Sequence, residues 1–426
     1  MTSAARPTVP GGLDIVSHDV YAAGIPHAAF AALRRDVPVA WTTEPDPDRG
    51  GAPRGFWSVT RHADLVAVHK DWRTYSSEIG GTEIEELAPD ALAARRTMLE
   101  TDPPRHTRLR QLVNPPFARA TVAQYEADAR AIVRSVIDDA LARPEIEFVH
   151  EVARELPIRM LCQILGVPME EAPQLFEWAD AIVYHADPDY SAAVVDQVDT
   201  DPYRLLPFRS PVSLKVFEWF ERLAAARRAA PAGDVITALS TAAVDGVPLT
   251  DTELDTFFLL LLIAGNETTR HGLSHGIQAF AEYPEQLRRL QQDPGLLDTA
   301  VEEVLRWSCP QIHFRRTATA ATELAGVPIA DGDRVVTWYL SANFDEREFP
   351  EPFQFDIGRR PNRHVTFGGG GPHLCLGQWL ARLEVRTVLE ELVPRLSAVE
   401  LAGPPQRVRS NFINGLKSLP LRWQGR

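Results

Sequence analysis

Apolar residues three and four positions apart recur along most of the chain, and this spacing predicts amphipathic helices. The clearest case covers residues 122–141, where Val122, Ala129, Val133, Ile137 and Leu141 fall on one helical face. The same spacing predicts further helices over residues 152–165, 249–289, 296–307 and 376–393. Stretches typical of strands are short, at residues 38–41, 55–60, 316–322 and 334–339. We therefore predict a mainly α fold with small, scattered β-sheets.

Three segments lack this periodicity. Residues 1–25 contain Pro and Gly and few periodic apolar positions, which predicts a loosely docked N-terminal arm. Residues 44–54 form a polar turn between two short strands. Residues 186–211 are acidic, interrupted by prolines and too long for an ordinary connection, so we expect either a mobile lid or a disordered bulge. Nothing in residues 26–426 marks a domain boundary.

The composition narrows the possible functions. The 426 residues include 44 Lys and Arg against 58 Asp and Glu, a net charge of −14, whereas nucleic-acid binding needs a basic face. Cys162, Cys309 and Cys375 are too few for a disulfide framework in a chain of this length, which favours a reducing, cytoplasmic location. The most apolar run, residues 257–264, is too short to span a membrane, so we expect a buried helix there.

The most informative segment for chemistry is FGGGGPHLCLG at residues 367–377. Consecutive glycines allow the backbone to approach another group closely, and Cys375 lies where this loop enters a predicted helix. Backbone N–H groups at a helix start favour a thiolate over a thiol. A single thiolate in a Gly-rich loop is typical of a ligand of haem iron. The alternative, a buried structural cysteine in a tight turn, is less consistent with the surrounding eleven residues.

This segment resembles the haem-binding loop of the cytochrome P-450 superfamily. The resemblance implies that Cys375 is the axial thiolate ligand and the metal ligand of haem b, that Phe367 packs beside the loop, and that Gly369 helps to form the haem cradle. The loop has one residue more than the commonest bacterial form. The longer form is similar to the haem-binding loop of the branch of the family that oxidises sterol side chains and branched lipids.

A second match lies in the predicted central helix, where AGNETT at residues 264–269 resembles the oxygen-activation motif of this family. The chemistry requires a small residue beside the iron, a hydroxyl that hydrogen-bonds dioxygen and an acid that supplies protons. By resemblance, Ala264 or Gly265, Thr268 and Glu267 have these roles. Glu267 follows a fully apolar run, so its carboxyl group is expected to be buried. Because burying a charged group is costly, we expect Glu267 to have a function.

Four basic residues match the family's partners for the two haem propionates. His106 and Arg110, in DPPRHTRLR at residues 102–110, are four residues apart, so both side chains reach the same side of a helix. Arg316 and His373 match the remaining partners, with Arg315 as the neighbouring competitor of Arg316.

A structural motif of the family matches Glu303 and Arg306 in the E-x-x-R pattern. In this family the Glu and the Arg of the pattern form an ion pair that stabilises the fold together with a third residue, and we refer to the three as the ion-pair lock. The third member is usually an arginine, and the equivalent position here is Gln354. Arg359 is the residue that could substitute for it.

The resemblance implies one mainly α haem domain over residues 26–426 and a monooxygenase that inserts one oxygen atom of dioxygen into a C–H bond. The substrate is expected to be hydrophobic, of the sterol, terpenoid or branched-lipid kind. The cavity that binds this substrate is expected to be lined by residues 79–92, 181–208, 257–263, 311–314 and 412–413. The alternatives are a tailoring oxidase of natural-product biosynthesis and, more remotely, a non-catalytic haem sensor or carrier.

Electrons are expected from separate partner proteins. About fifty residues follow Cys375, too few for a reductase or flavin segment, so we predict a ferredoxin with its ferredoxin reductase. Arg108, Arg119, Arg382 and Arg386 flank the haem-loop segments and are predicted to form a basic docking face on an otherwise acidic protein.

Overall fold

The computed structural model describes residues 6–44 and 54–425. The α-helices are α1 His18–Ala23, α2 His27–Asp36, α3 His62–Lys70, α4 Pro89–Arg95, α5 Arg105–Phe117, α6 Arg119–Val122, α7 Glu126–Leu141, α8 Glu155–Leu165, α9 Ala172–Val183, α10 Ser213–Ala229, α11 Val235–Ser240, α12 Asp251–Glu282, α13 Pro284–Gln292, α14 Leu297–Ser308, α15 Tyr339–Ala342 and α16 Gln378–Leu392. The strands are β1 Val39–Thr43, β2 Gly55–Val59, β3 Tyr75–Ser76, β4 Glu145–Glu147, β5 Ala243–Val244, β6 Val247–Pro248, β7 His313–Ala318, β8 Thr322–Leu324, β9 Val327–Ile329, β10 Arg334–Trp338, β11 Leu396–Leu401, β12 Gln406–Arg407, β13 Leu416–Ser418 and β14 Pro420–Gly425.

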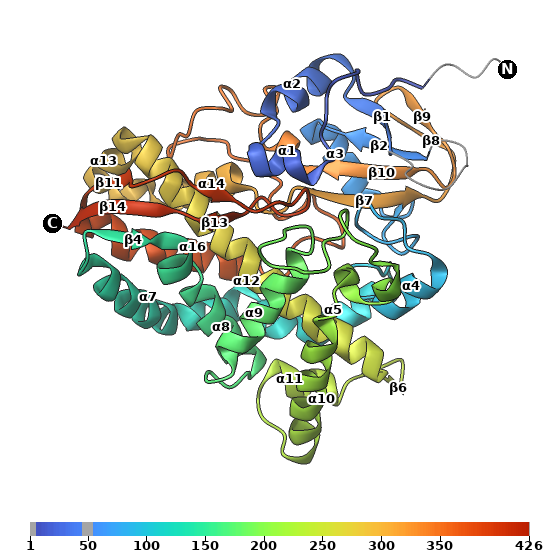
Figure 1. Ribbon diagram of the computed structural model, residues 1–426, viewed down its shortest axis with the longest axis horizontal. Coiled ribbons are helices and arrows are strands. Elements are labelled where there is room, and N and C mark those ends of the chain that lie inside the picture. The colour runs from blue at the N-terminus through green and yellow to red at the C-terminus, as the bar shows by residue number, and fades with distance from the viewer. Residues whose placement is uncertain (1–5, 45–53, 426) are drawn as a thin grey trace.

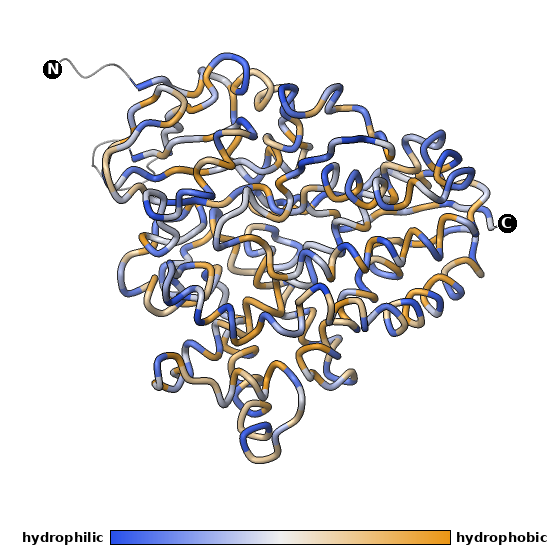
Figure 2. The backbone as a smooth tube through the Cα atoms, turned by 180° about the vertical axis from the view of Figure 1, so that it is seen from behind, coloured by the Kyte–Doolittle hydropathy of each residue, from blue (hydrophilic) through white to orange (hydrophobic). Residues whose placement is uncertain are grey.

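Helix α12 runs diagonally through the molecule and organises the fold (Figure 1). Helices α8, α14 and α16 pack against it, and α7 packs against α8 and α16. The outer helices show orange and blue alternately along their length in Figure 2, as expected for helices with one face in the core. The mainly α prediction is therefore confirmed.

The main sheet has the strand order β1-β2-β10-β7-β3, with β10 parallel to β2 and the other neighbours antiparallel. It lies beside the helical part of the molecule (Figure 1). A second sheet joins β11, β14 and β4, and short two-stranded pairs complete the fold. The strands are thus small and scattered, as predicted.

The ends of α12 follow from local chemistry. The Thr250 side chain accepts a hydrogen bond from the Glu253 N–H, and the Glu253 carboxylate accepts one from the Thr250 N–H, which forms a capping box. The helical stretch predicted over residues 249–289 is present as two helices, because α12 ends at Glu282. Tyr283 leaves the helical conformation because the Pro284 ring clashes with an α-helical residue before it, and Pro284 then starts α13.

The strand predicted over residues 316–322 is displaced. Strand β7 begins earlier, at His313, because it pairs with β10 in a register that places Arg316 opposite Val335. Residues 322–329 instead form the β8–β9 hairpin, in which Gly326 takes a φ of +80° that favours glycine at the turn.

Two segments without periodicity are better packed than the sequence suggests. In the predicted arm, Ile15 and Tyr21 are buried, and the Tyr21 hydroxyl donates a hydrogen bond to the Ile15 carbonyl over 2.8 Å. In residues 186–211 the Asp187 carboxylate is fully buried and accepts hydrogen bonds from Lys417 Nζ and the Arg409 N–H, both over 2.8 Å. The disordered-bulge interpretation is therefore wrong. The predicted turn at residues 44–54 lies mostly outside the described residues.

The ion-pair lock is present with a different third member. Glu303 and Arg306 are fully buried and form two hydrogen bonds of 2.8 Å. Arg359 Nε lies 3.2 Å from the Glu303 carboxylate, so Arg359 is the third member. The Gln354 prediction is wrong, because that residue is exposed and contributes only its backbone carbonyl, which accepts from Arg359. Two arginines on one carboxylate satisfy its oxygens in a buried site.

Candidate functional site

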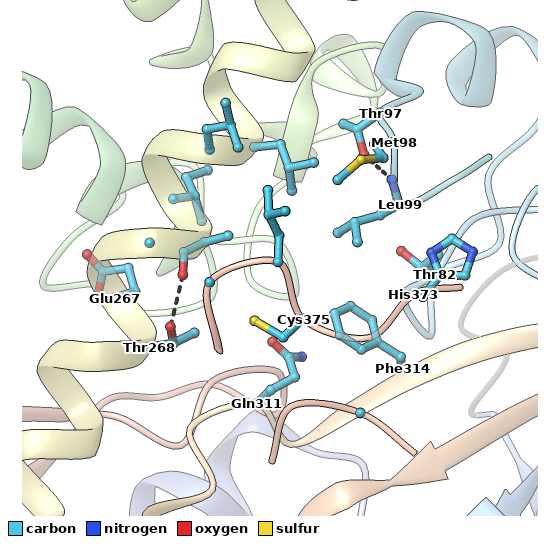
Figure 3. A pocket seen from close by; sticks show the side chains of 18 of the residues that line it. Thr82, Thr97, Met98, Leu99, Glu267, Thr268, Gln311, Phe314, His373 and Cys375 are labelled. Carbon is cyan, nitrogen blue, oxygen red and sulfur yellow. Dashed lines mark hydrogen bonds between the residues drawn. The ribbon is translucent and has the colours of Figure 1, made fainter. Parts of the chain in front are cut away.

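A cavity of about 310 Å³ lies between α12, the Cys375 loop, β7 and the segment before α5. Figure 3 shows Cys375 near its centre, with Thr268 on one side and Thr82 and His373 on the other. The lining is largely apolar, as for a site that receives hydrophobic groups. Every predicted lining segment contributes residues to the cavity, but the long segment 181–208 contributes only Pro207 and Phe208, at its end.

The Cys375 loop is built by its backbone. The Cys375 N–H donates a hydrogen bond to the Phe367 carbonyl over 2.9 Å, and Gly377 caps α16 immediately beyond. Gly371 has a φ of +74°, and a Cβ there would lie 2.2 Å from the His69 carbonyl oxygen. The loop can therefore take this path against α3 only with glycine at residue 371.

The two other loop residues named from the sequence lie in different places. Phe367 lines the cavity, as expected. Gly369 faces α3 instead, where a Cβ would lie 2.9 Å from Leu65 Cδ2, and its neighbour Gly368 lines the cavity. The structure therefore does not bring Gly369 to the site, and its role is close packing of the loop.

The ionisation of Cys375 reflects opposing effects. Burial raises the pKa of the Cys375 thiol, while the backbone N–H groups of Gly377 and Gln378 and the guanidinium of Arg110 act in the opposite direction. The helix start therefore does not by itself produce a thiolate. A bound metal ion is the additional positive charge that a thiolate needs here.

Four basic side chains converge on one end of the cavity. His106 and Arg110 come from α5, Arg316 from β7 and His373 from the Cys375 loop, and all four line the cavity. The rings of His106 and His373 lie 4.2 Å apart between centroids. Within the described part of the chain, Arg110 and Arg316 donate hydrogen bonds only to the backbone carbonyls of Pro372 and Arg315, and neither pairs with a carboxylate. The predicted set is therefore assembled in space.

This basic cluster lacks the anion that would balance it. Nδ1 of His106 and Nε2 of His373 are buried and have no hydrogen-bond partner among the described residues. Burial together with Arg110 and Arg316 lowers the pKa of His106 to about 4. A group with carboxylates at this end would supply the missing acceptors, so the cluster and the single thiol of Cys375 fit a haem with its two propionates.

The structure distinguishes the two neighbouring arginines of β7. Arg315 points away from the cavity, where Nη1 donates to the Gly80 and Glu85 carbonyls over 3.1 and 3.2 Å. Arg316 lines the cavity, with Nη1 bonded only to the Arg315 carbonyl. Successive residues of a strand point to opposite faces, so only Arg316 is available to a ligand.

On α12, the residues named from the sequence occupy two sides of the helix. Ala264, Gly265 and Thr268 line the cavity, and the Thr268 hydroxyl donates to the Ala264 carbonyl over 2.9 Å. In Figure 3 the Thr268 side chain lies on the Cys375 side of α12, whereas the Glu267 carboxylate points away from it. Thr268 and Glu267 therefore connect the cavity with a different region behind α12.

Glu267 lies in a buried polar network. Its carboxylate contacts Arg270 and the Tyr184 hydroxyl, and it accepts a hydrogen bond from Asn266 over 2.7 Å. Arg270 also pairs with Asp180 over 3.2 Å. One guanidinium thus serves two carboxylates.

The pKa values of the two carboxyl groups in this network, Glu267 and Asp180, are shifted in opposite directions. Burial, together with nearby Asp180, raises the pKa of Glu267 well above its usual range. For Asp180 burial acts in the same direction, but the attraction of Arg270 outweighs it and lowers the pKa. The arrangement therefore favours the protonated form of Glu267 and the charged form of Asp180.

Sequence reasoning missed several residues of this network. The His271 Nδ1 accepts from the Leu416 N–H over 3.2 Å, so its Nε2 carries the proton and donates to the Tyr184 hydroxyl over 2.6 Å. The one sequence signal is the helical i, i+4 spacing of Glu267 and His271. Tyr184 and Asp180 lie far from this motif in the sequence and have no such signal.

No helix within residues 6–44 and 54–425 combines the length and apolar character needed to cross a membrane.

Comparisons with known proteins give the family. A family model described as Cytochrome P450 matches residues 221–418. A methyl-branched lipid omega-hydroxylase of Mycobacterium tuberculosis is 36% identical over 98% of this chain and 96% of its own length. A steroid C26-monooxygenase of Rhodococcus jostii is 34% identical, covering 99% of this chain and 87% of its own length. The solved structure of a Mycobacterium marinum cytochrome P450 in complex with pseudoionone has a TM-score of 0.88 at 36% identity and covers 99% of this chain and all of that one. The chain therefore belongs to the cytochrome P450 family, whose members carry haem b on an axial cysteine thiolate and act as monooxygenases.

Proposed function

We propose that this monooxygenase hydroxylates an unactivated carbon at the end of a branched hydrocarbon, in a substrate of the sterol, terpenoid or branched-lipid kind. The names of the two relatives, a methyl-branched lipid omega-hydroxylase and a steroid C26-monooxygenase, support this substrate class. The largely apolar lining of the cavity is consistent with it, because such substrates offer few polar groups.

The observation that carries the proposal is the position of Cys375 in the same cavity as the basic cluster. Cys375 Sγ would be the axial ligand, and His106, Arg110, Arg316 and His373 would hold the propionates. The haem supplies dioxygen activation and the transfer of one oxygen atom into a C–H bond, with the other oxygen leaving as water. The rest of the chemistry belongs to the protein's own side chains.

Those side chains exclude water and hold protons. Ala264 leaves space beside Thr268, whose hydroxyl can present a hydrogen bond to the cavity when it leaves the Ala264 carbonyl. Glu267 stores a proton behind α12, and Asp180, which is partly exposed, links the network to solvent. On α12 the Thr268 hydroxyl and the Glu267 carboxyl group are adjacent in sequence, so this pair would supply protons to the cavity.

The proposal is tested by product analysis. The haem protein, reconstituted with a ferredoxin, a ferredoxin reductase and reduced nicotinamide, is expected to convert a branched lipid or a sterol into an alcohol oxidised at a terminal side-chain carbon. With ¹⁸O-labelled dioxygen the alcohol should carry the label, because one oxygen atom comes from dioxygen. Oxidation confined to polyketide or peptide substrates would instead assign the enzyme to natural-product tailoring.

The basic cluster gives a separate expectation. Replacing Arg316 or Arg110 with alanine should leave a buried propionate without its partner, which typically costs about 3–5 kcal/mol. The measured quantity is the haem-to-protein ratio after gel filtration, and we expect it to fall in both variants. Arg134→Ala, at an exposed ion pair on α7, is the matched control and should retain haem. Full haem retention in Arg110→Ala and Arg316→Ala would contradict the propionate assignment.

The electron donors and the location are also part of the proposal. We infer a ferredoxin and its reductase as partners, and a cytoplasmic location. The four arginines of the predicted docking face are mostly neutralised: Arg108 pairs with Asp245, Arg382 with Glu302, and Arg386 with Asp298 and Glu390. Arg119 instead lies over the Trp379 ring at 4.8 Å. Electrostatic attraction at this face would therefore be weaker than the sequence suggests.

A non-catalytic sensor or carrier is the remaining alternative. Such a protein needs neither a hydroxyl at Thr268 nor a stored proton at Glu267, and keeping Glu267 buried among charged groups is costly. The network behind α12 therefore favours an enzyme.

A further inference from the structure

Three acidic residues line the cavity, and one of them has no partner. Glu100 accepts hydrogen bonds from the Thr82 hydroxyl over 2.6 Å and from Thr97, and Glu267 belongs to the network behind α12. Glu83 forms no hydrogen bond or ion pair within the described part of the chain. A carboxyl group in a largely apolar cavity is expensive unless something satisfies it.

The backbone around Glu83 is fixed. The Arg315 N–H donates to the Thr82 carbonyl over 2.7 Å, and the Thr317 hydroxyl donates to the Ile79 carbonyl over 2.8 Å. The Arg315 guanidinium holds the Gly80 and Glu85 carbonyls. Strand β7 therefore supports this segment on both sides of Glu83 and presents its carboxyl group from a defined place.

The charged groups that face Glu83 are Glu85, Glu100 and Arg95. Arg95 cannot neutralise it fully, because Nη1 binds Glu85 over 3.1 Å and Nη2 binds the Arg204 carbonyl. Burial, reinforced by Glu85 and opposed by Arg95, raises the pKa of Glu83 to about 8. At neutral pH the group is therefore mostly an uncharged carboxylic acid, which both donates and accepts hydrogen bonds.

Glu83 lines the cavity, and the segment that carries it reaches the side of the cavity opposite Thr268. Its neighbour Thr82 is on the opposite side of Cys375 from Thr268 in Figure 3. A substrate held at Glu83 would extend its apolar part across the cavity towards Thr268. The polar group of such a substrate would therefore bind at Glu83, while a different part of the same molecule would be oxidised near Thr268.

We propose that Glu83 is a specificity-determining residue that hydrogen-bonds a hydroxyl or keto oxygen at the end of the substrate remote from the oxidised carbon. This inference rests on the proposed function and narrows its substrate class to hydrophobic molecules with one neutral oxygen group. A carboxylate at the same position would meet the acidic group of Glu83 beside Glu85 and Glu100, and is selected against. A bare hydrocarbon would leave Glu83 unsatisfied.

The test compares ligand pairs that differ only in the oxygen group: cholestan-3-one with cholestane, and phytanol with phytane. Affinity is measured on the full haem protein by the spin-state shift and, independently, by the ligand-induced rise in melting temperature. The parent protein should bind the oxygenated member about tenfold more tightly, as expected for a buried polar group that gains a partner. Glu83→Leu should abolish this preference, whereas Glu83→Gln, which still donates a hydrogen bond, should retain most of it.

Two controls make the result specific. Glu218→Leu, at an exposed position on α10, should keep the preference of the parent. Raising the pH above about 8 should weaken binding of the ketone in the parent, because Glu83 loses the proton that it donates, but not in Glu83→Gln.

The failures can be told apart. An unchanged preference in Glu83→Leu would overturn the inference and leave the proposed function intact. If the parent carries haem, as its carbon monoxide spectrum would establish, yet binds none of the four ligands, then the proposed substrate class fails and the inference fails with it.

Discussion

Replacing Cys375 with alanine is expected to remove the red-shifted Soret band that we predict for the reduced parent protein under carbon monoxide, and with it all hydroxylation. The band is characteristic of a thiolate opposite the carbon monoxide, and Cys375 is the only cysteine lining the cavity within the described residues. Haem content is measured in the same sample. Because the basic cluster still offers its four side chains, some haem should remain bound without the thiolate spectrum.

The other two cysteines are the matched controls. Cys162 and Cys309 are buried in apolar clusters and do not line the cavity, and burial raises the pKa of Cys162 to about 12. Replacing either with alanine should cost some stability but leave the carbon monoxide spectrum unchanged. Persistence of the thiolate band in Cys375→Ala, or its loss in Cys309→Ala, would move the ligand to another residue.

The parts of the site that could be predicted from sequence are those formed by contiguous residues. The loop at residues 367–377 and the segment at residues 264–269 each combine the required residue types within a few positions. The local physics of a Gly-rich turn and of a helix then places them. His106 and Arg110 follow the same logic, since the i, i+4 spacing alone brings them to one side of α5.

What could not be predicted depends on contacts between distant segments. Arg359, rather than Gln354, reaches Glu303 because of the path of the irregular chain after α15, which has no periodic signal. Glu83 is one of several acidic residues in its segment, and its place in the cavity depends on the contacts of that segment with β7, far away in the sequence. Tyr184 and Asp180 join Glu267 through packing of α9 and the following turn on α12, so no local pattern marks them.

The same contacts change the interpretation of Glu267. From sequence it is the acid that supplies protons to the cavity. In the structure it is fully buried and held by Arg270, Tyr184 and Asn266. A proton therefore has to pass through Asp180 or Tyr184 before it reaches Glu267, and the whole network becomes the delivery route.

Glu267→Gln is accordingly expected to slow turnover and enlarge the solvent isotope effect. The amide keeps the size and much of the hydrogen bonding of the neutral acid but has no proton to release. A positioned proton-transfer group typically contributes about 10²–10⁴-fold, which is the size of the expected loss in rate. Asp180→Asn, at the outer end of the network, should produce a smaller effect of the same kind.

Thr268→Ala is expected to misdirect electrons rather than stop them. Thr268 lines the cavity, and its hydroxyl donates a hydrogen bond to the Ala264 carbonyl. A ligand in the cavity that accepts a hydrogen bond could take the place of that carbonyl. Without the hydroxyl the stored proton on Glu267 has no ordered path into an apolar cavity. Reduced nicotinamide should therefore still be consumed through the redox partners, while hydrogen peroxide replaces most of the hydroxylated product.

Thr268→Ser decides whether the hydroxyl or the shape of the side chain matters. Serine keeps the hydroxyl on the same helical turn, so product formed per reduced nicotinamide should stay near that of the parent, with little peroxide. If Thr268→Ala couples electrons to product as well as the parent does, protons reach the cavity without this hydroxyl. If serine uncouples as strongly as alanine, the methyl group of Thr268, through its packing, is what the reaction requires.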